Sequence, residues 1–368
     1  MFGILVVAFT SCQAVVVPDR NRQVEFTYNR NVQQQLQELR GAIVSMPNRQ
    51  STGSVTVPLG TSYPSRLVAL NTEPPVGSLR TVGTGSAAVN VSLSNATVTG
   101  ETGDFWNGTT RAYSTGGLVY RPRYNEYRSA PETVYENTVL YNEFRQGNTT
   151  IRDQALIDGK RVRVIALNGS LGRTEQGSLP VDVEPLSSSD RRVSVRNATS
   201  NVTLTIPTRR SASTWRSWLA DERVTNGGHV VGLTGEPLPD RAFDLVHVHL
   251  EPGVTYTLAM ARVGVGTRTR SPGSASLTDV TGNGTKVPDD GTQRVVVEVR
   301  DRYNNPVSGV EVNASADVGT VSAVGTNESD NQGRARSSTT RPRSPARPRR
   351  RSTGVRGRAD EQIRRHHT

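Results

Sequence analysis

Residues 293–315, QRVVVEVRDRYNNPVSGVEVNAS, contain the pattern that decides the fold class. Valine recurs at every second position of residues 295–299, and successive side chains of a strand point to opposite faces, so one face is apolar. Asn304-Asn305-Pro306 has the composition of a turn, after which Val310 and Val312 resume the alternation. The stretch therefore predicts a strand, a turn and a second strand.

The same alternation recurs upstream, throughout residues 50–275. Residues 161–164, 202–206 and 254–260 each place apolar side chains at every second position, and Gly, Pro, Asn and Asp separate such runs. Only 34% of the chain is hydrophobic and 5% aromatic, a composition that favours short, half-buried strands over helical layers. We expect a mainly β protein built of antiparallel β-sandwich domains.

One segment of this body has helical spacing instead. In residues 213–222, STWRSWLADE, Trp215, Trp218 and Leu219 follow the i, i+3, i+4 pattern after a capping-type Ser213. This predicts a short amphipathic helix whose tryptophans pack on a sheet. Tryptophans that line a sugar site are the alternative.

The N-terminus predicts an anchor. Residues 1–17, MFGILVVAFTSCQAVVV, are uncharged and largely apolar, although they are shorter than the ~20 residues that span a bilayer and no basic residue precedes them. A start upstream of Met1 would explain both departures. Residues 33–46 have helical spacing, so we expect residues 1–48 to form a hydrophobic anchor and a helical stalk. A lipid-modified Cys12, and a buried helix of a globular domain, are the alternatives.

The net charge of +11 is concentrated at the C-terminus. Residues 337–368 hold ten arginines against Asp360 and Glu361, a local +8, and subtracting this from +11 leaves +3 for the rest of the chain. So dense a run of like charge and proline predicts a disordered Arg-rich tail. Because the body is nearly balanced, we expect no nucleic-acid partner, and a basic arm for DNA or an acidic cell wall is the alternative.

Residues 290–336 resemble the bacterial Ig-like domains of the invasin and intimin type, also called Big-1 domains. In that family a V-x-D-x-x-x-N-P-V-x-G-V-x-V pattern leads to a later T-D-x-x-G-x-A turn, which corresponds here to Ser329–Ala335. The resemblance implies an extracellular β-sandwich spacer or adhesive module without catalytic residues. After residue 336 the family continues with an apolar strand, whereas this chain becomes Arg-rich. We therefore expect a truncated module, and a frameshift near residue 336 would account for it.

The remainder resembles haloarchaeal surface proteins in which a pilin-like N-terminal anchor carries a β-rich ectodomain. The phrases ETGDFWNGTTRAYSTGGLVYRP, residues 101–122, and NGGHVVG, residues 226–232, carry this resemblance. It implies membrane anchoring and display outside the cell, and agrees with the preference for Arg over Lys. The body is less acidic than such proteins, and no signal-peptidase motif precedes the apolar segment.

Asn-x-Ser/Thr sequons support the same location. The chain has 22 asparagines, and Ser or Thr occupies about one position in five, so roughly four or five sequons would arise by chance. Ten occur, at Asn90, Asn95, Asn107, Asn148, Asn168, Asn197, Asn201, Asn283, Asn313 and Asn327. We expect these asparagines to be glycosylated, with incidental sequons in an Asn- and Thr-rich β protein as the alternative.

Markers of catalysis are missing from the sequence. There is no Gly-x-Ser-x-Gly, no His-Glu-x-x-His and no P-loop, so we expect no enzymatic activity, no cofactor and no small-molecule substrate. Cys12 is the one cysteine, which excludes a disulfide within the chain. His247 and His249 share a strand face and could hold a metal with Asp240 or Asp244, although exposed strand histidines are the preferred interpretation.

Tyrosine and arginine concentrate in residues 113–145, which hold six of the ten tyrosines. These residue types are enriched at interaction hot spots. The contact candidates are Tyr120, Tyr124, Tyr127, Arg121 and Arg123. A long loop that packs its own tyrosines is the alternative.

Together these patterns predict a non-enzymatic structural or adhesion protein at the cell surface, with a membrane and other surface proteins or glycans as partners. The predicted organisation is an anchor and stalk at 1–48, a β-rich ectodomain at 50–275, an Ig-like module at 290–336 and a tail at 337–368. The other function class is a secreted carbohydrate-active or proteolytic enzyme with an Ig-like accessory domain. That class requires convergent carboxylates or a catalytic triad within residues 50–275.

Overall fold

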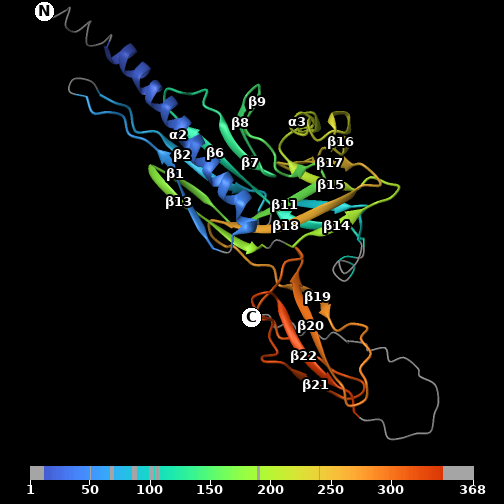
Figure 1. Cartoon of the computed structure of the whole chain (residues 1–368). Coiled ribbons are helices and arrows are strands. Elements are labelled where there is room, and N and C mark those ends of the chain that lie inside the picture. Colours follow the sequence, from blue (N-terminus) through green and yellow to red (C-terminus); the bar gives the residue numbers. More distant parts are fainter. Residues whose placement is uncertain are drawn as a thin grey trace, which may run out of the picture. The chain divides into compact units, whose positions relative to one another are not determined.

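The computed structural model describes residues 12–49, 51–66, 70–84, 89–98, 103, 106, 108–188, 191–239 and 241–342 (Figure 1). The chain divides into two compact units, Met1–Val98 with Gly108–Ser271, and Thr99–Asn107 with Pro272–Thr368. The described residues are mainly β, with several sheets of mostly antiparallel strands and one long helix near the N-terminus. This confirms the predicted β-rich class.

The long helix α2, Val17–Ser45, confirms the helix predicted over residues 33–46 and begins sixteen residues earlier. A π-helical turn, Cys12–Val16, precedes it, and a 3-10 turn, Met46–Asn48, follows it. Pro18 lies at the start of the helix, where its missing N–H costs nothing. Among the described residues, no helix has both the length and the apolar character needed to cross a membrane.

A sheet of thirteen strands forms most of the first unit. Its main path runs β10-β11-β18-β13-β1-β2-β6-β7-β8-β9, with β12 paired to β2, and β14 paired to β18 and β4. Every pairing in it is antiparallel except that of β11 with β18. The strands are β1 Gly53–Gly60, β2 Val76–Val82, β4 Thr97–Val98, β6 Gly117–Arg123, β7 Glu132–Glu136, β8 Val139–Phe144, β9 Gly147–Arg152, β10 Ile157–Asp158, β11 Arg161–Asn168, β12 Gly172–Glu175, β13 Gly177–Ser187, β14 Val193–Arg196 and β18 Thr255–Val265.

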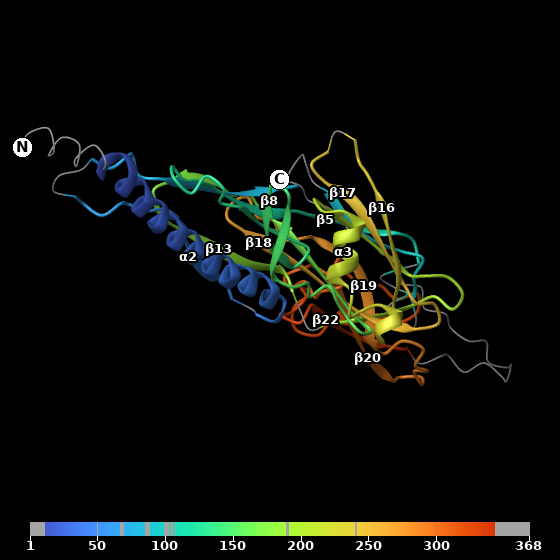
Figure 2. The same ribbon diagram turned by 90° about the horizontal axis from the view of Figure 1, so that it is seen from above.

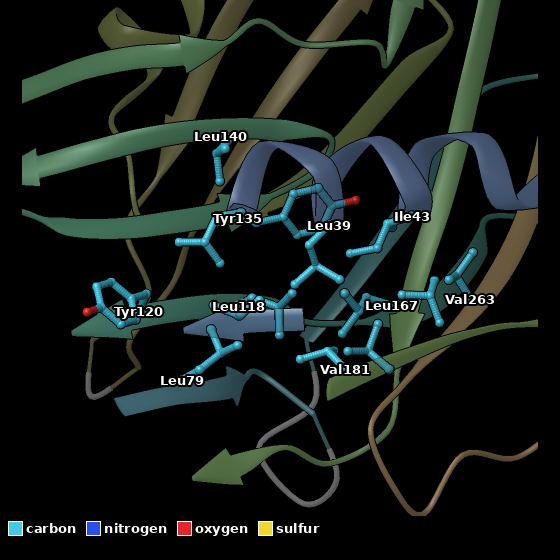
Figure 3. Close-up of a cluster of buried hydrophobic side chains, with 14 of the residues drawn as sticks. Leu39, Ile43, Leu79, Leu118, Tyr120, Tyr135, Leu140, Leu167, Val181 and Val263 are labelled. Atoms are coloured by element: carbon cyan, nitrogen blue, oxygen red, sulfur yellow. The ribbon is translucent and has the colours of Figure 1, made fainter. Parts of the chain in front are cut away.

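Helix α2 lies lengthwise along one face of this sheet (Figure 2). Its apolar stripe, Val32, Leu36, Leu39 and Ile43, is at most 4% exposed. Figure 3 shows Leu39 and Ile43 pointing toward leucines and valines of the sheet, among them Leu79, Leu118, Leu167, Val181 and Val263. Full burial of each such side chain contributes about 1.5–3 kcal/mol. Residues 32–46 of the predicted anchor and stalk, 1–48, therefore pack into the core of the first unit instead of standing apart from it, and residues 1–11 lie outside the described residues.

A second sheet of the first unit has the order β16-β17-β15-β3-β5. Its strands are β3 Val89–Ser94, β5 Arg111–Thr115, β15 Thr203–Thr208, β16 Val230–Glu236 and β17 Asp244–Leu250. Helix α3, Ala212–Trp218, lies beside β16 (Figure 1) and confirms the predicted short helix. Its N-cap is Ser211 rather than Ser213, because the Ser211 hydroxyl accepts the backbone N–H of Thr214. Trp215 is fully buried and Trp218 is 9% exposed, so both pack within the protein.

The second unit contains a four-stranded antiparallel sheet of order β19-β20-β22-β21. Its strands are β19 Ser274–Thr281, β20 Thr292–Asp301, β21 Thr320–Ala323 and β22 Arg334–Thr340. The strand predicted at residues 295–299 is confirmed. The segment around Val310 and Val312 is not a strand; it forms an isolated bridge and three backbone hydrogen bonds with residues 327–329. β22 continues four residues past 336 because its Ser and Thr side chains are compatible with a half-exposed strand, so the tail does not begin at 337. β19 starts within the residues assigned to the ectodomain, which moves the boundary to residue 272.

Two aspartate turns hold the ends of this sheet. The carboxylate of Asp301 accepts the backbone N–H groups of Tyr303, at 2.7 Å, and of Asn305, at 3.1 Å. Asp330 accepts those of Gln332 and Arg334, both at 2.9 Å. The Arg334 N–H and then the Arg336 guanidinium lower the pKa of Asp330. The turn residues singled out in the sequence therefore satisfy backbone donors where strands end.

Candidate functional site

The predicted contact residues lie at the end of β6 and in the loop that follows it. Tyr120 is fully buried, Tyr124 and Tyr127 are half-buried, and Arg121 and Arg123 are exposed. The rings of Tyr124 and Tyr127 stack at a centroid distance of 6.1 Å. The ring of Tyr127 also meets the edge of Phe26 on α2, at 5.5 Å. The structure brings the tyrosines together but directs most of their surface into the protein.

A buried carboxylate on α2 fastens this loop. Glu25 is 0% exposed and accepts the backbone N–H groups of three consecutive residues: Asn125 at 2.9 Å, Glu126 at 2.9 Å and Tyr127 at 2.6 Å. It also accepts the hydroxyl of Tyr63 at 2.5 Å. A charged acceptor facing three amides makes stronger hydrogen bonds than a neutral one. We call this arrangement the Glu25 latch.

Two buried asparagines, Asn21 and Asn29, lie one helical turn to either side of Glu25, and we call these three residues the polar seam of α2. Asn21 accepts from Arg66 at 2.8 Å, and Asn29 accepts the hydroxyl of Tyr124 at 3.3 Å. Burial, followed by the Glu25 hydrogen bond, raises the pKa of Tyr63 to about 12, and burial raises the pKa of Tyr120 to about 12. The Tyr63 hydroxyl donates to Glu25 on the helix, and the hydroxyls of Tyr120 and Tyr124 lie 3.4 Å apart.

The sequence contained a signal for this seam. Residues 21, 25, 29, 32, 36, 39 and 43 form one stripe at helical spacing, polar at its first three positions and apolar afterwards. Sequence reasoning used only the apolar part, because buried Asn and Glu are rare unless paired. The partners that pair them, Tyr63, Arg66 and residues 124–127, are distant in sequence.

Three glutamates of the first unit gather around two arginines. Arg209 contacts Glu143 at 3.0 Å and Glu132 at 3.7 Å, and Arg210 also pairs with Glu143. Glu136 is buried, and burial raises its pKa although Thr208 and the Arg209 amide donate hydrogen bonds to it. These carboxylates converge as the enzyme alternative requires, but each already has a cationic or hydroxyl partner.

An aromatic group adjoins these charges. Arg210 lies over the ring of Tyr141 at 5.4 Å, and Tyr141 contacts Trp218 at 5.3 Å. Trp215 meets Trp218 edge to face at 5.1 Å, and its indole N–H donates to Thr208 at 2.8 Å. The tryptophans of α3 thus join the helix to β8 and β15, in agreement with the predicted packing role.

The paired histidines lie on the more open face of β17. His247 contacts Thr205 at 2.8 Å and Glu236 at 3.0 Å, and His249 contacts Thr203 at 3.2 Å. Burial, and then the neighbouring imidazole, lower the pKa of His249. Asp244 alternates onto the opposite face of the strand, and Asp240 lies outside the described residues. In the part of the chain that the structure describes, no three His, Cys, Asp or Glu side chains are arranged to hold a metal ion.

The sequons differ in exposure. Five asparagines are exposed: Asn90, Asn95, Asn283, Asn313 and Asn327. Four are half-buried: Asn148, Asn168, Asn197 and Asn201. Asn107 lies outside the described residues. The side-chain amides of Asn197 and Asn201 donate to the backbone carbonyls of Asn95, at 2.8 Å, and Leu250, at 2.7 Å. A glycan on either nitrogen would disturb these contacts.

No protein-family model, curated protein or solved structure matches this chain. The geometry described above is therefore the basis for a functional interpretation.

Proposed function

We propose that this chain is a non-enzymatic structural or adhesion protein of the cell surface, held at a membrane by its N-terminal apolar segment. One observation carries the proposal. α2 follows the apolar run of residues 1–17 in the sequence, and its C-terminal half packs into the core of the first unit, so an anchor in that run would be joined to the body by a helix that is part of the core.

The exposed side chains at the beginning of the helix support this arrangement. Val15 is 67% exposed, Val16 is 42% exposed and Phe26 is 47% exposed, which leaves apolar surface uncovered where the helix continues the apolar run. Exposed apolar surface of this kind is typical of membrane or protein contacts. The Glu25 latch secures the same part of the helix to the body.

The second unit serves in this proposal as an Ig-like sandwich module, and β19–β22 form one of its sheets. Its resemblance to Big-1 domains supports this assignment. The residues of the resembling motifs have clear local roles, since Asp301, Asn305 and Asp330 organise turns. Exposed sequons on both units support display outside the cell, where glycosylated surfaces face solvent.

Cell fractionation combined with external protease tests the proposal. We expect the full chain to stay in the membrane fraction after a high-salt wash and to be digested by protease added to intact cells. A variant lacking residues 1–13 should be released into the soluble fraction.

A variant lacking residues 343–368 is the matched control, because it loses the dense arginines but keeps the apolar segment. Retention of this control distinguishes apolar anchoring from attraction of the basic tail to anionic lipids, which high salt weakens. Protection of the body from external protease, or release by salt alone, would overturn the proposal.

A further inference from the structure

An open pocket lies on the thirteen-stranded sheet where α2 ends. Pro47 and Asn48, just after the helix, form one wall, and Arg161, Arg163 and Arg192 are among the other lining residues. All of these residues belong to the first unit. We call this feature the arginine pocket.

Strand register explains why the arginines meet there. Arg163 of β11 pairs with Ala259 of β18. Arg163 lies on the same face of the sheet as Ala259, because residues paired across neighbouring strands point to the same side. On the other edge of β18, the register of β14 begins with Val193 paired to Leu258 in antiparallel orientation, and Arg192 directly precedes that strand. Arg163 and Arg192, from segments on the two edges of β18, thus line the pocket together with Ala259.

The floor between the arginines consists of small residues. Thr257 and Ala259 line it, and they cannot fill the space between two arginine side chains. On the opposite face of the same strands, Val193 and Leu258 are each 1% exposed. Because that face is packed into the core, the backbone beneath the pocket is fixed.

The charge of the pocket is poorly compensated by the described residues. Arg161 has an ion pair with Asp158 at 4.0 Å, but the two side chains are 72% and 82% exposed, so the pair is weak. Among the described residues, neither Arg163 nor Arg192 has a carboxylate within ion-pair distance.

The C-terminal end of α2 is a rival partner for these arginines, because helix carbonyls carry partial negative charge. Two carbonyls there already have donors, however. The Met46 N–H donates to Ile43, and the Arg49 N–H donates to Met46 at 2.9 Å. If the arginines only complement the negative end of the helix, the pocket binds no anionic ligand, and a binding experiment distinguishes the two explanations.

We propose that the arginine pocket binds the carboxylate or sulfate group of an acidic sugar. The planar guanidinium fork matches such an oxyanion and makes strong, directional hydrogen bonds to it. The Thr257 hydroxyl offers a further donor, while Ala259 and Pro47 offer apolar contact to a sugar ring. The proposal rests on the proposed function only for the source of the sugar, a glycan at the cell surface.

Binding of trigalacturonate to the purified full chain, in mild detergent and at two salt concentrations, tests the proposal, with maltotriose as the neutral probe. The double variant Arg163→Gln, Arg192→Gln should raise the Kd about tenfold or more, since each tenfold corresponds to about 1.4 kcal/mol of lost charge-assisted bonding. A sulfated trisaccharide tests the second anion class in the same assay.

The matched control is Arg152→Gln, Arg173→Gln, which removes the same charge from exposed strand positions of the first unit. The basic tail is identical in all variants, so it cannot produce a difference between them. We expect the control to change the Kd by less than about twofold, as usual for sites away from a ligand.

Equal loss of affinity in both double variants would show diffuse charge attraction and overturn the proposal, as would absence of binding to either anion. Tighter binding of a short DNA strand than of trigalacturonate, lost in the pocket variant, would assign the pocket to phosphate instead. None of these outcomes depends on whether the chain is found at a membrane, so the two proposals fail separately.

Discussion

Replacing Glu25 with glutamine is the sharpest test of how α2 is held to the body. In the native latch, one carboxylate oxygen accepts from Tyr63 and the Asn125 amide, and the other accepts the amides of Glu126 and Tyr127. Glutamine retains one oxygen and turns an NH₂ group toward two N–H donors. Two charge-assisted hydrogen bonds are lost in a fully buried site, at about 1.5–3 kcal/mol each.

We therefore expect Glu25→Gln to lower the free energy of unfolding of the first unit by about 3–6 kcal/mol, a large effect of the kind that broken buried networks produce. Urea unfolding followed by the fluorescence of Trp215 and Trp218 measures this change. Opening of the loop should also speed trypsin cleavage after Arg123 and Arg128.

Glu38→Gln is the control, because Glu38 lies on the same helix, is exposed, and accepts only from Gln35 at 3.4 Å among the described contacts. Its effect should stay within about 0.5 kcal/mol. If Glu25→Gln matches the control in both stability and cleavage rate, the latch does not hold the loop and the reasoning is refuted.

Three further predictions concern the core, a pH effect and the sequons. Leu39→Ala should lower the free energy of unfolding in urea by about 3 kcal/mol, because it leaves a cavity under α2. Leu70→Ala, at an 81% exposed position, should change it by almost nothing. Equal effects of the two substitutions would contradict the packing of the helix. The pKa of Asp330 is lowered in the folded state, so its contribution to the stability of the second unit is present above its ordinary pKa of 3.8 and is lost as pH falls through the folded value. Asp330→Asn should therefore be less stable than wild type at neutral pH, with the gap closing in acid, and a gap independent of pH would disprove the assignment. Glycopeptide mass spectrometry of native protein should find Asn283, which is exposed, more fully occupied than Asn201, whose amide is bonded to a backbone carbonyl, and the reverse order would refute the role given to exposure.

Helices and strands were predicted correctly where the spacing of apolar residues places them on one side of the element. The alternation over residues 295–299 became β20, and the spacing of Trp215, Trp218 and Leu219 became α3 with its buried aromatic side. The alternation around Val310 and Val312 did not become a strand: the segment forms one isolated bridge, Glu311 with Glu328, with backbone hydrogen bonds between residues 309–312 and 327–329 beside it. Local propensity thus favours an extended chain but does not determine how many of its residues pair with a neighbouring strand.

The predicted contact residues show more clearly what a local sequence pattern cannot predict. Tyr and Arg are concentrated in residues 113–145, but whether a tyrosine faces solvent depends on what packs over it. Helix α2, a hundred residues earlier in the chain, covers Tyr120 and Tyr124 and supplies Glu25. No local pattern contains that information.

By itself, the sequence determined the β-rich class, the long helix after the apolar segment, the turns of the second unit and the concentration of arginine at the end of the chain, because each depends on residues close together along the chain. Only the tertiary structure decided that the helix is part of the core rather than a stalk, that Asn21, Glu25 and Asn29 are buried together, and that Arg163 and Arg192 line one pocket. The physical reason is that burial and register are properties of pairs of distant segments. Whether a polar stripe is buried, or an arginine lines a pocket, depends on the strand or loop that packs against it.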